Sequence, residues 1–225
     1  MSKIWYLSPS NQSANIGVGS YGSEKKQMNL LVGQIVPHLD RAGVSFHVGD
    51  PDMTIQERAR ESNEIRACFH LALHSNAGGK GLARGPVAYY YSDAGKEFGQ
   101  KLVKGLLALG QENNRSCNVR QEKSFYELRK TTAPACLLEV DFHDSPDGAR
   151  FIPPRREEIA EAIARVIIEA DGKAFVPETR GEHLEQAVKL GLFPSDTRWT
   201  DVMTKEDAAV LAVGLKMLLE KGVKL

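Results

Sequence analysis

Short apolar runs rich in β-branched and aromatic residues alternate with longer segments of helical period along the first three quarters of the chain. Strands are expected at 3–8, 43–50, 68–75, 85–92 and 135–142. Helices are expected at 23–42, 54–67, 94–111 and 156–170, the first capped by Ser23. This alternation predicts an α/β domain: a mostly parallel, twisted sheet of about six strands, flanked by helices on both faces.

The pattern changes after about residue 175. Residues 182–225 contain two further helical segments, "EHLEQAVKLGL" and "KEDAAVLAVGLKMLLEKG", separated by a turn-rich stretch. About 45 residues cannot bury much core alone. We therefore expect a main domain at 1–175 and a small helical C-terminal module at 182–225 that packs on it or on another subunit.

Composition limits the kinds of partner that the chain could bind and the compartment in which it is expected to fold. The chain has 29 basic and 29 acidic residues, so no excess charge favours nucleic acid or a membrane surface. The three cysteines, Cys68, Cys117 and Cys136, are odd in number and lack CxxC spacing, which predicts reduced thiols. No apolar run approaches a membrane span, and "MSKIWYLSPS" does not resemble a signal peptide. We expect synthesis in the cytoplasm without an export signal.

Candidate chemistry lies where the expected strands end, because ligands of open α/β sheets bind beyond the carboxyl ends of the strands. "SPSNQ" follows the first strand, Glu24 opens the next helix, His74 ends the third strand, and Glu139 lies near the end of the last. One imidazole, two carboxylates and an amide suit a metal ion with a catalytic base. His70 lies about 13 Å from His74 along a strand, so we expect a hydrogen-bonded core histidine.

Four segments together resemble a known family: "YLSPSNQ", "HLALHSNAGG", "GPVAYYYS" and "YELRKTTAPACLLEVDFHD". In this order they are similar to the zinc-dependent N-acetylmuramoyl-L-alanine amidases, amidase type 3, of bacteria, phages and spore formers. The resemblance covers roughly residues 3–170. It implies hydrolysis of the amide bond between N-acetylmuramic acid and L-alanine in peptidoglycan, with Zn²⁺ as cofactor.

Carried over by position, the resemblance implies that Glu24 and His74 are zinc ligands and that Glu139 is the catalytic acid/base. For Glu24 the alternative is a surface carboxylate favoured by a helix N-terminus. For Glu139 the alternative is an ion pair with a neighbour such as Arg129 or Lys130.

The chain departs from the family at the first strand, where the usual "DPGHGG" supplies a histidine ligand and this chain has "SPSNQS". Gln12 is the preferred substitute, with Asn11 or His143 as alternatives; His143 could instead orient substrate or stack on its loop. An amide oxygen is a weaker zinc ligand than an imidazole. The resemblance also implies substrate contacts from Arg129 and Asn76, although Asn76 could simply fix its loop.

Two rival functions remain open: a zinc peptidase acting on the stem peptide, and a non-catalytic cell-wall-binding protein derived from an amidase, which the missing histidine suggests. Lacking an export signal, an amidase of this kind would be an endolysin or autolysin, reaching the wall after lysis or by a holin-type route. Residues 182–225 would then serve wall binding, packing or homodimerisation, with Trp199 stacking on sugar or packing on the main domain.

Overall fold

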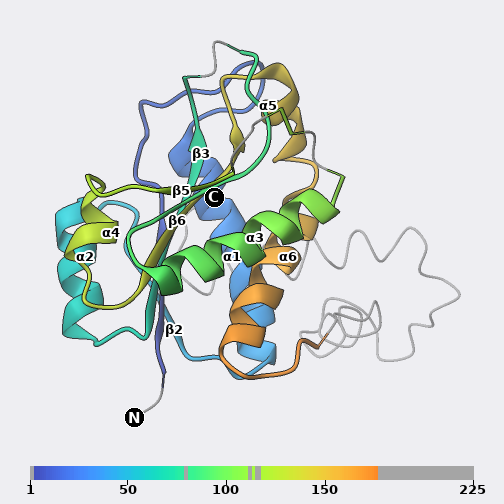
Figure 1. The fold of residues 1–225 in the computed structure, drawn as a ribbon. Helices are drawn as coiled ribbons and strands as arrows, with labels where there is room; N and C mark the ends of the chain where they lie inside the picture. The colour runs from blue at the N-terminus through green and yellow to red at the C-terminus, as the bar shows by residue number, and fades with distance from the viewer. Residues whose placement is uncertain (1–2, 79–80, 111–112, 115–117, 177–225) are drawn as a thin grey trace, which may run out of the picture. The chain divides into compact units, whose positions relative to one another are not determined.

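The computed structural model describes residues 3–78, 81–110, 113–114 and 118–176. Its sheet has the order β2-β1-β3-β6-β4-β5, and every neighbouring pair is parallel except β4 and β6. The strands are β1 Trp5–Pro9, β2 Phe46–Val48, β3 Phe69–Asn76, β4 Val87–Tyr90, β5 Val119–Gln121 and β6 Ala135–Phe142. The expected mostly parallel sheet of about six strands is confirmed (Figure 1).

Helices cover both faces of the sheet, as expected. They are α1 Glu24–Arg41, α2 Ile55–Glu64, α3 Asp93–Ala108, α4 Tyr126–Lys130, α5 Pro146–Phe151 and α6 Arg156–Ala170. α1, α3 and α6 pack together on one side, and α2 and α4 lie together on the other (Figure 1). The side chain of Ser23 caps α1 by accepting a hydrogen bond from the Lys26 amide, and the helix continues through Pro37 to Arg41.

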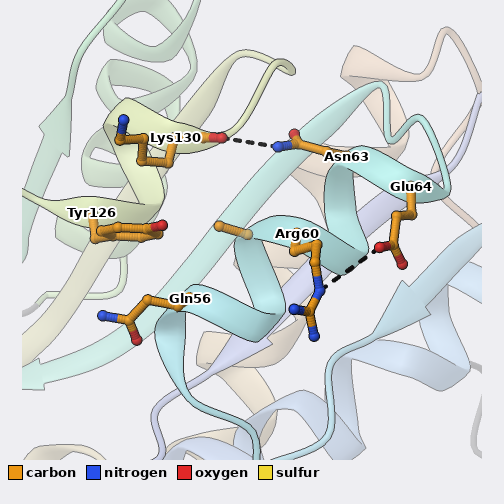
Figure 2. A pocket seen from close by; sticks show the side chains of 7 residues that line it. Gln56, Arg60, Asn63, Glu64, Tyr126 and Lys130 are labelled. Atoms are coloured by element: carbon orange, nitrogen blue, oxygen red, sulfur yellow. Dashed lines mark hydrogen bonds and ion pairs between the residues drawn. The ribbon is translucent and has the colours of Figure 1, made fainter.

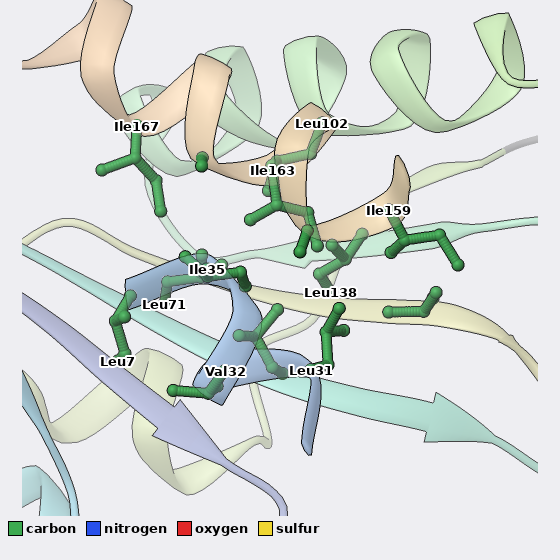
Figure 3. Packing of buried hydrophobic residues seen from close by; sticks show 14 of the residues in the cluster. Leu7, Leu31, Val32, Ile35, Leu71, Leu102, Leu138, Ile159, Ile163 and Ile167 are labelled. Carbon is green, nitrogen blue, oxygen red and sulfur yellow. The ribbon is translucent and has the colours of Figure 1, made fainter. Parts of the chain in front are cut away.

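The apolar core lies between the sheet and the helices α1, α3 and α6. Alternate residues of a strand face opposite sides, and on this side β1, β3 and β6 contribute leucines. They meet leucine, valine and isoleucine side chains from the three helices (Figure 3). The labelled members are Leu7, Leu31, Val32, Ile35, Leu71, Leu102, Leu138, Ile159, Ile163 and Ile167. This packing fixes the strand ends that carry the candidate site.

The opposite side of the sheet carries a network of buried polar groups beside a small apolar cluster of Ala72, Leu128, Ala135 and Leu137. Ser8 Oγ donates to Glu127 Oε1 at 2.5 Å, and Arg58 Nη1 donates to Ser8 Oγ at 3.2 Å. His70, which is fully buried, lies with Nε2 3.0 Å from the same Glu127 oxygen and stacks on Tyr6. The expectation that His70 is a hydrogen-bonded core histidine is confirmed.

Three of the sequence predictions concern residues that lie outside the part of the chain described by the structure. The helical module at 182–225, Trp199 and Cys117 all fall there, and the predictions for them stay predictions. Cys68 and Cys136 are free thiols. Among the described helices, none has the length and hydropathy needed to cross a membrane.

Candidate active site

His74 and Glu139 lie side by side at the carboxyl end of the sheet. They are register partners on the neighbouring parallel strands β3 and β6, so their side chains share the face that does not carry the leucine core. Glu24 reaches this point from the first turn of α1, which follows β1. Three segments far apart in the sequence thus converge where α/β sheets bind their ligands.

The His74–Glu24 pair is buried. Nδ1 of His74 is 2.7 Å from Oε1 of Glu24, and the two residues are 6% and 1% exposed. The alternative of a surface carboxylate at Glu24 is therefore wrong. Burial opposes the charge on both groups, yet their mutual hydrogen bond and attraction prevail, so the pKa of Glu24 is lowered and that of His74 is raised.

Asn15 is a site residue that the sequence did not reveal. Its Nδ2 donates to Oε2 of Glu24 at 2.8 Å and to Oε1 of Gln12 at 2.6 Å. Because the ionised carboxylate of Glu24 only accepts hydrogen bonds, Asn15 must present its NH₂ group here. Gln12 therefore turns its oxygen toward Asn15 and its NH₂ toward His74.

Gln12, rather than Asn11, reaches the pair. Nε2 of Gln12 is 3.3 Å from His74 Nδ1, whereas Asn11 Nδ2 donates to the Met53 carbonyl at 2.8 Å. Nδ1 carries at most one proton. When Nδ1 is protonated, its N–H faces the NH₂ group of Gln12, and two donors then oppose each other. When Nδ1 is not protonated, its lone pair faces the carboxylate of Glu24, and two acceptors then oppose each other.

Glu139 provides a buried carboxylate oxygen facing this group. The residue as a whole is partly exposed, but its Oε2 is buried and has no hydrogen-bond partner among the described residues. Burial raises the pKa of Glu139 to about 7, against the attraction of His74, and Glu24 adds to the rise. The alternative ion pair with Arg129 or Lys130 is not formed.

His143 lies with a different group of residues. Its Nδ1 is 2.9 Å from Oγ of Ser75, which accepts from the hydroxyl of Tyr21 at 2.8 Å, and its ring stacks on Tyr21. Ser75 follows His74 in the strand and so faces the other side of the sheet. The structure therefore does not bring His143 to the pair, and its stacking matches the structural role left open for it.

The two residues expected to contact substrate differ in their surroundings. Asn76 Oδ1 accepts from the Ala77 amide at 2.8 Å and the Asn76 carbonyl accepts from the His143 amide, so this residue fixes its loop. Arg129 lies in the last turn of α4 with an exposed side chain. Gly78, Gly81 and Gly85, beyond β3, adopt positive φ angles that only glycine accepts freely, which suits an open loop at this edge.

Two pockets lie apart from these side chains. One, of about 390 Å³, opens between α2 and α4 and is lined by the residues in Figure 2, where Asn63 donates to the Lys130 carbonyl and Arg60 pairs with Glu64. The other, of about 480 Å³, lies between the β1–α1 loop and α5. No predicted site residue lines either of these two pockets.

A divalent cation fits the chemistry of the donor groups only in part. Among the described residues, no three His, Cys, Asp or Glu side chains gather as a metal-binding group. An imidazole and a carboxylate do meet, and an amide takes the third place. A cation drawing on the Nδ1 lone pair would suit the Glu24 carboxylate, whereas the NH₂ group of Gln12 only donates and offers such a cation no ligand in its present orientation.

Fold and site together define an α/β protein with an imidazole, two carboxylates and two amides at the carboxyl edge of a mostly parallel sheet. Residues 12–169 match the Amidase_3 family, described as N-acetylmuramoyl-L-alanine amidase, and the chain belongs to this family.

A curated protein is similar to this chain in sequence, and solved structures are similar to it in fold. The chain is 26% identical over 167 residues to "Probable cell wall amidase LytH" of Staphylococcus aureus, covering 72% of this chain but only 56% of LytH. Its fold is similar to the catalytic domain of CwlV from Bacillus (Paenibacillus) polymyxa var. colistinus, with a TM-score of 0.66 and 19% identity, covering 75% of this chain and 97% of that one. For AmiC2 of Nostoc punctiforme the TM-score is 0.66, the identity 21% and the coverage 75% and 96%.

Proposed function

We propose that this chain is a peptidoglycan hydrolase that cleaves the amide bond between N-acetylmuramic acid and L-alanine. Membership of the amidase family supports the reaction class. The observation that carries the proposal is the buried Oε2 of Glu139, which lies beside the His74–Glu24 pair and has no hydrogen-bond partner among the described residues. An unpartnered buried carboxylate is costly to keep, and a catalytic role accounts for its presence.

Glu139 is proposed as the general acid and base. With a pKa near 7, its carboxylate accepts a proton from the attacking water and returns it to the amine of the leaving L-alanine. A group whose pKa lies close to the working pH serves both steps. Removal of this group is expected to cost about 10²- to 10⁴-fold in rate.

His74, Glu24 and Gln12 are the proposed holders of a zinc ion. His74 and Glu24 offer an imidazole nitrogen and a carboxylate oxygen, and Gln12 would complete a set of three by turning its amide oxygen, which now accepts from Asn15, toward the ion. When bound at such a site, zinc activates water and polarises the scissile carbonyl. Arg129 and Asn76 remain proposed substrate contacts.

Digestion of purified peptidoglycan tests the proposal. New amino termini should be L-alanine, the activity should disappear with a chelator and return with Zn²⁺, and Glu139→Gln should be inactive while still binding walls. Glu158→Gln, which alters an exposed carboxylate paired with Arg155, is the matched control and should retain full activity. New amino termini from other stem residues would instead identify a peptidase.

A second candidate is a wall-binding protein without catalysis. It is favoured by the absence of three ionisable ligands in the described part of the chain. This candidate predicts co-sedimentation with walls, no bound zinc and no new amino termini. The same digestion, with the zinc content of the protein measured alongside, separates the two functions.

A further inference from the structure

A pocket of about 480 Å³ lies between the β1–α1 loop and α5, the helix that follows β6 at the carboxyl edge of the sheet (Figure 1). Its volume is typical of ligand pockets, which are mostly apolar and carry a few polar groups that orient the ligand. One charged side chain, that of Arg150, lines the pocket. Its apolar lining comes from Val18, Pro146, Ala149, Pro153 and Pro154.

The guanidinium of Arg150 forms no hydrogen bond or ion pair with any residue that the structure describes. Asp147, the acidic residue of α5, pairs instead with Arg84 at 2.8 Å, and the nearby Arg155 pairs with Glu158. A guanidinium binds a carboxylate by two parallel hydrogen bonds when both groups are free to meet. The pocket therefore combines an apolar wall with one uncompensated positive charge, which suits a peptide that carries a carboxylate.

Backbone hydrogen bonds fix the walls of the pocket before any ligand binds. The Val18 amide donates to the His143 carbonyl at 2.9 Å, which ties the β1–α1 loop to the turn after β6. The Gly17 amide donates to the Gly22 carbonyl at 2.9 Å, which closes the loop on itself. The two prolines between α5 and α6 have fixed φ angles. A ligand entering such a preformed pocket loses little binding free energy to the ordering of the protein.

We propose that this pocket is a subsite for the stem peptide of peptidoglycan, in which Arg150 binds a peptide carboxylate. Both walls belong to segments that also carry the candidate active site. The β1–α1 loop brings Asn15 to Glu24, and the turn after β6 begins at His143, four residues beyond Glu139. The inference rests on the proposed function for the identity of the peptide, but it requires no particular set of metal ligands.

Binding of two synthetic peptides tests the subsite. The probes are L-alanyl-γ-D-glutamyl-L-lysine amide, whose glutamyl carboxylate is free, and the same peptide with that carboxylate converted to an amide. Calorimetric titration of the full chain should show a preference for the acid of about 10- to 100-fold, as expected for hydrogen bonds between charged groups. Arg150→Gln should abolish the preference by weakening binding of the acid alone, whereas Arg150→Lys should retain part of it.

Arg60→Gln is the matched control, because Arg60 is an exposed arginine of α2, on the other side of the sheet, and is already paired with Glu64. It should leave both affinities unchanged. Ser20→Trp places a bulky ring on an exposed residue of the pocket lining and should weaken binding of both peptides. Loss of the preference in Arg60→Gln but not in Arg150→Gln would place the carboxylate on α2 and overturn the proposal.

The outcomes distinguish the subsite from the proposed function. If the full chain cleaves walls but binds acid and amide equally, or if Arg150→Gln keeps the preference, the subsite is refuted and the amidase function stands. If the full chain cleaves nothing but prefers the acid through Arg150, the amidase function fails and the peptide-binding pocket stands. Melting temperatures of all variants verify that each compared protein is folded.

Discussion

The proposal that the Gln12 amide takes the place of the family's histidine ligand can be tested with a single substitution. Gln12→His puts an imidazole next to His74 and Glu24, where the amide nitrogen now lies 3.3 Å from His74 Nδ1. Imidazole is the better zinc donor, so we expect zinc affinity to rise by about tenfold or more, equivalent to ~1.4 kcal/mol. Competition with a chromogenic chelator measures the change.

Asn11→His is the matched control for that substitution. It places the same side chain one position earlier, where Asn11 points to the Met53 carbonyl and away from the pair. Zinc affinity should then stay at the parent value. A gain with Asn11→His and none with Gln12→His would show that the wrong residue has been assigned to the ligand position.

Glu139 gives the zinc-free protein a characteristic pH dependence. Its pKa rises from 4.5 to about 7 on folding, so it binds more protons in the folded state between these values. Its contribution to stability is therefore complete below about pH 4.5 and is lost as the pH rises through 7. Between pH 5 and 8 the melting temperature of the parent chain should therefore fall by several degrees more than that of Glu139→Gln. The conversion is about 2–4 °C for each kcal/mol of unfolding free energy in a domain of this size.

The comparison with Glu139→Gln cancels titrations that both proteins share. Chelator-treated samples of each are melted across the pH range, with Glu158→Gln as a carboxylate control expected to follow the parent chain. A difference in melting temperature between parent and Glu139→Gln that stays constant, or that grows in favour of the parent at high pH, would contradict a raised pKa.

Individual residues differ in how far the sequence could assign them. The spacing of His70 and His74 along one strand was enough to show that they cannot bind one ion, because strand geometry fixes the distance, but the choice of His74 for the site came from the family resemblance. The choice between Asn11 and Gln12 required the structure, since it depends on how the loop after β1 turns. Asn15 gave no signal at all, because a loop has no periodicity that assigns directions to its side chains.

At the scale of elements, α2 and α4 are joined to the sheet by buried charge. Arg58 is fully buried, Glu127 is 4% exposed, and both contact the hydroxyl of Ser8. Glu127→Ala removes a buried negative charge that attracts Arg58 and that bonds to Ser8 and His70, and it should cost about 3–5 kcal/mol of unfolding free energy, measured by urea denaturation. Arg58 keeps its carbonyl partners at Asp50 and Pro9, which favours the lower end of this range.

Glu158→Ala is the surface control for the buried Arg58–Glu127 network. It removes an exposed carboxylate that pairs with Arg155, and such surface pairs contribute about 0–1 kcal/mol. Similar losses in Glu127→Ala and Glu158→Ala would show that the Arg58–Glu127 network does not hold these helices to the sheet.

The sequence predicted long elements well and short ones poorly. α1 and α6 were expected within a residue or two of their ends, because a full apolar stripe spans several turns and Ser23 supplies a cap. α4, α5 and β5 were missed, because five, six and three residues are too few to establish a period.

For the whole molecule, alternation of strands and helices was sufficient to predict an α/β fold, but not the order of its strands. Order depends on contacts between distant segments, such as β6 lying between β3 and β4, and local pattern carries no information about them. The antiparallel pairing of β4 with β6 likewise depends on contacts between distant segments and could not be predicted from local pattern. Function was predicted chiefly from resemblance, since the site combines side chains from four separate segments.

The chain divides near residue 175. The sheet and the helices that cover it end with α6 at Ala170, and Phe175 still packs against the core. We expect residues 1–176 to melt within a few degrees of the full chain and to bind zinc equally well. A large loss of stability would mean that 182–225 packs on the main domain. If the truncated chain and the full-length Trp199→Ala variant both fail to co-sediment with walls, residues 182–225 bind the wall. If light scattering shows a dimer for the full chain and a monomer for residues 1–176, residues 182–225 form the dimer contact.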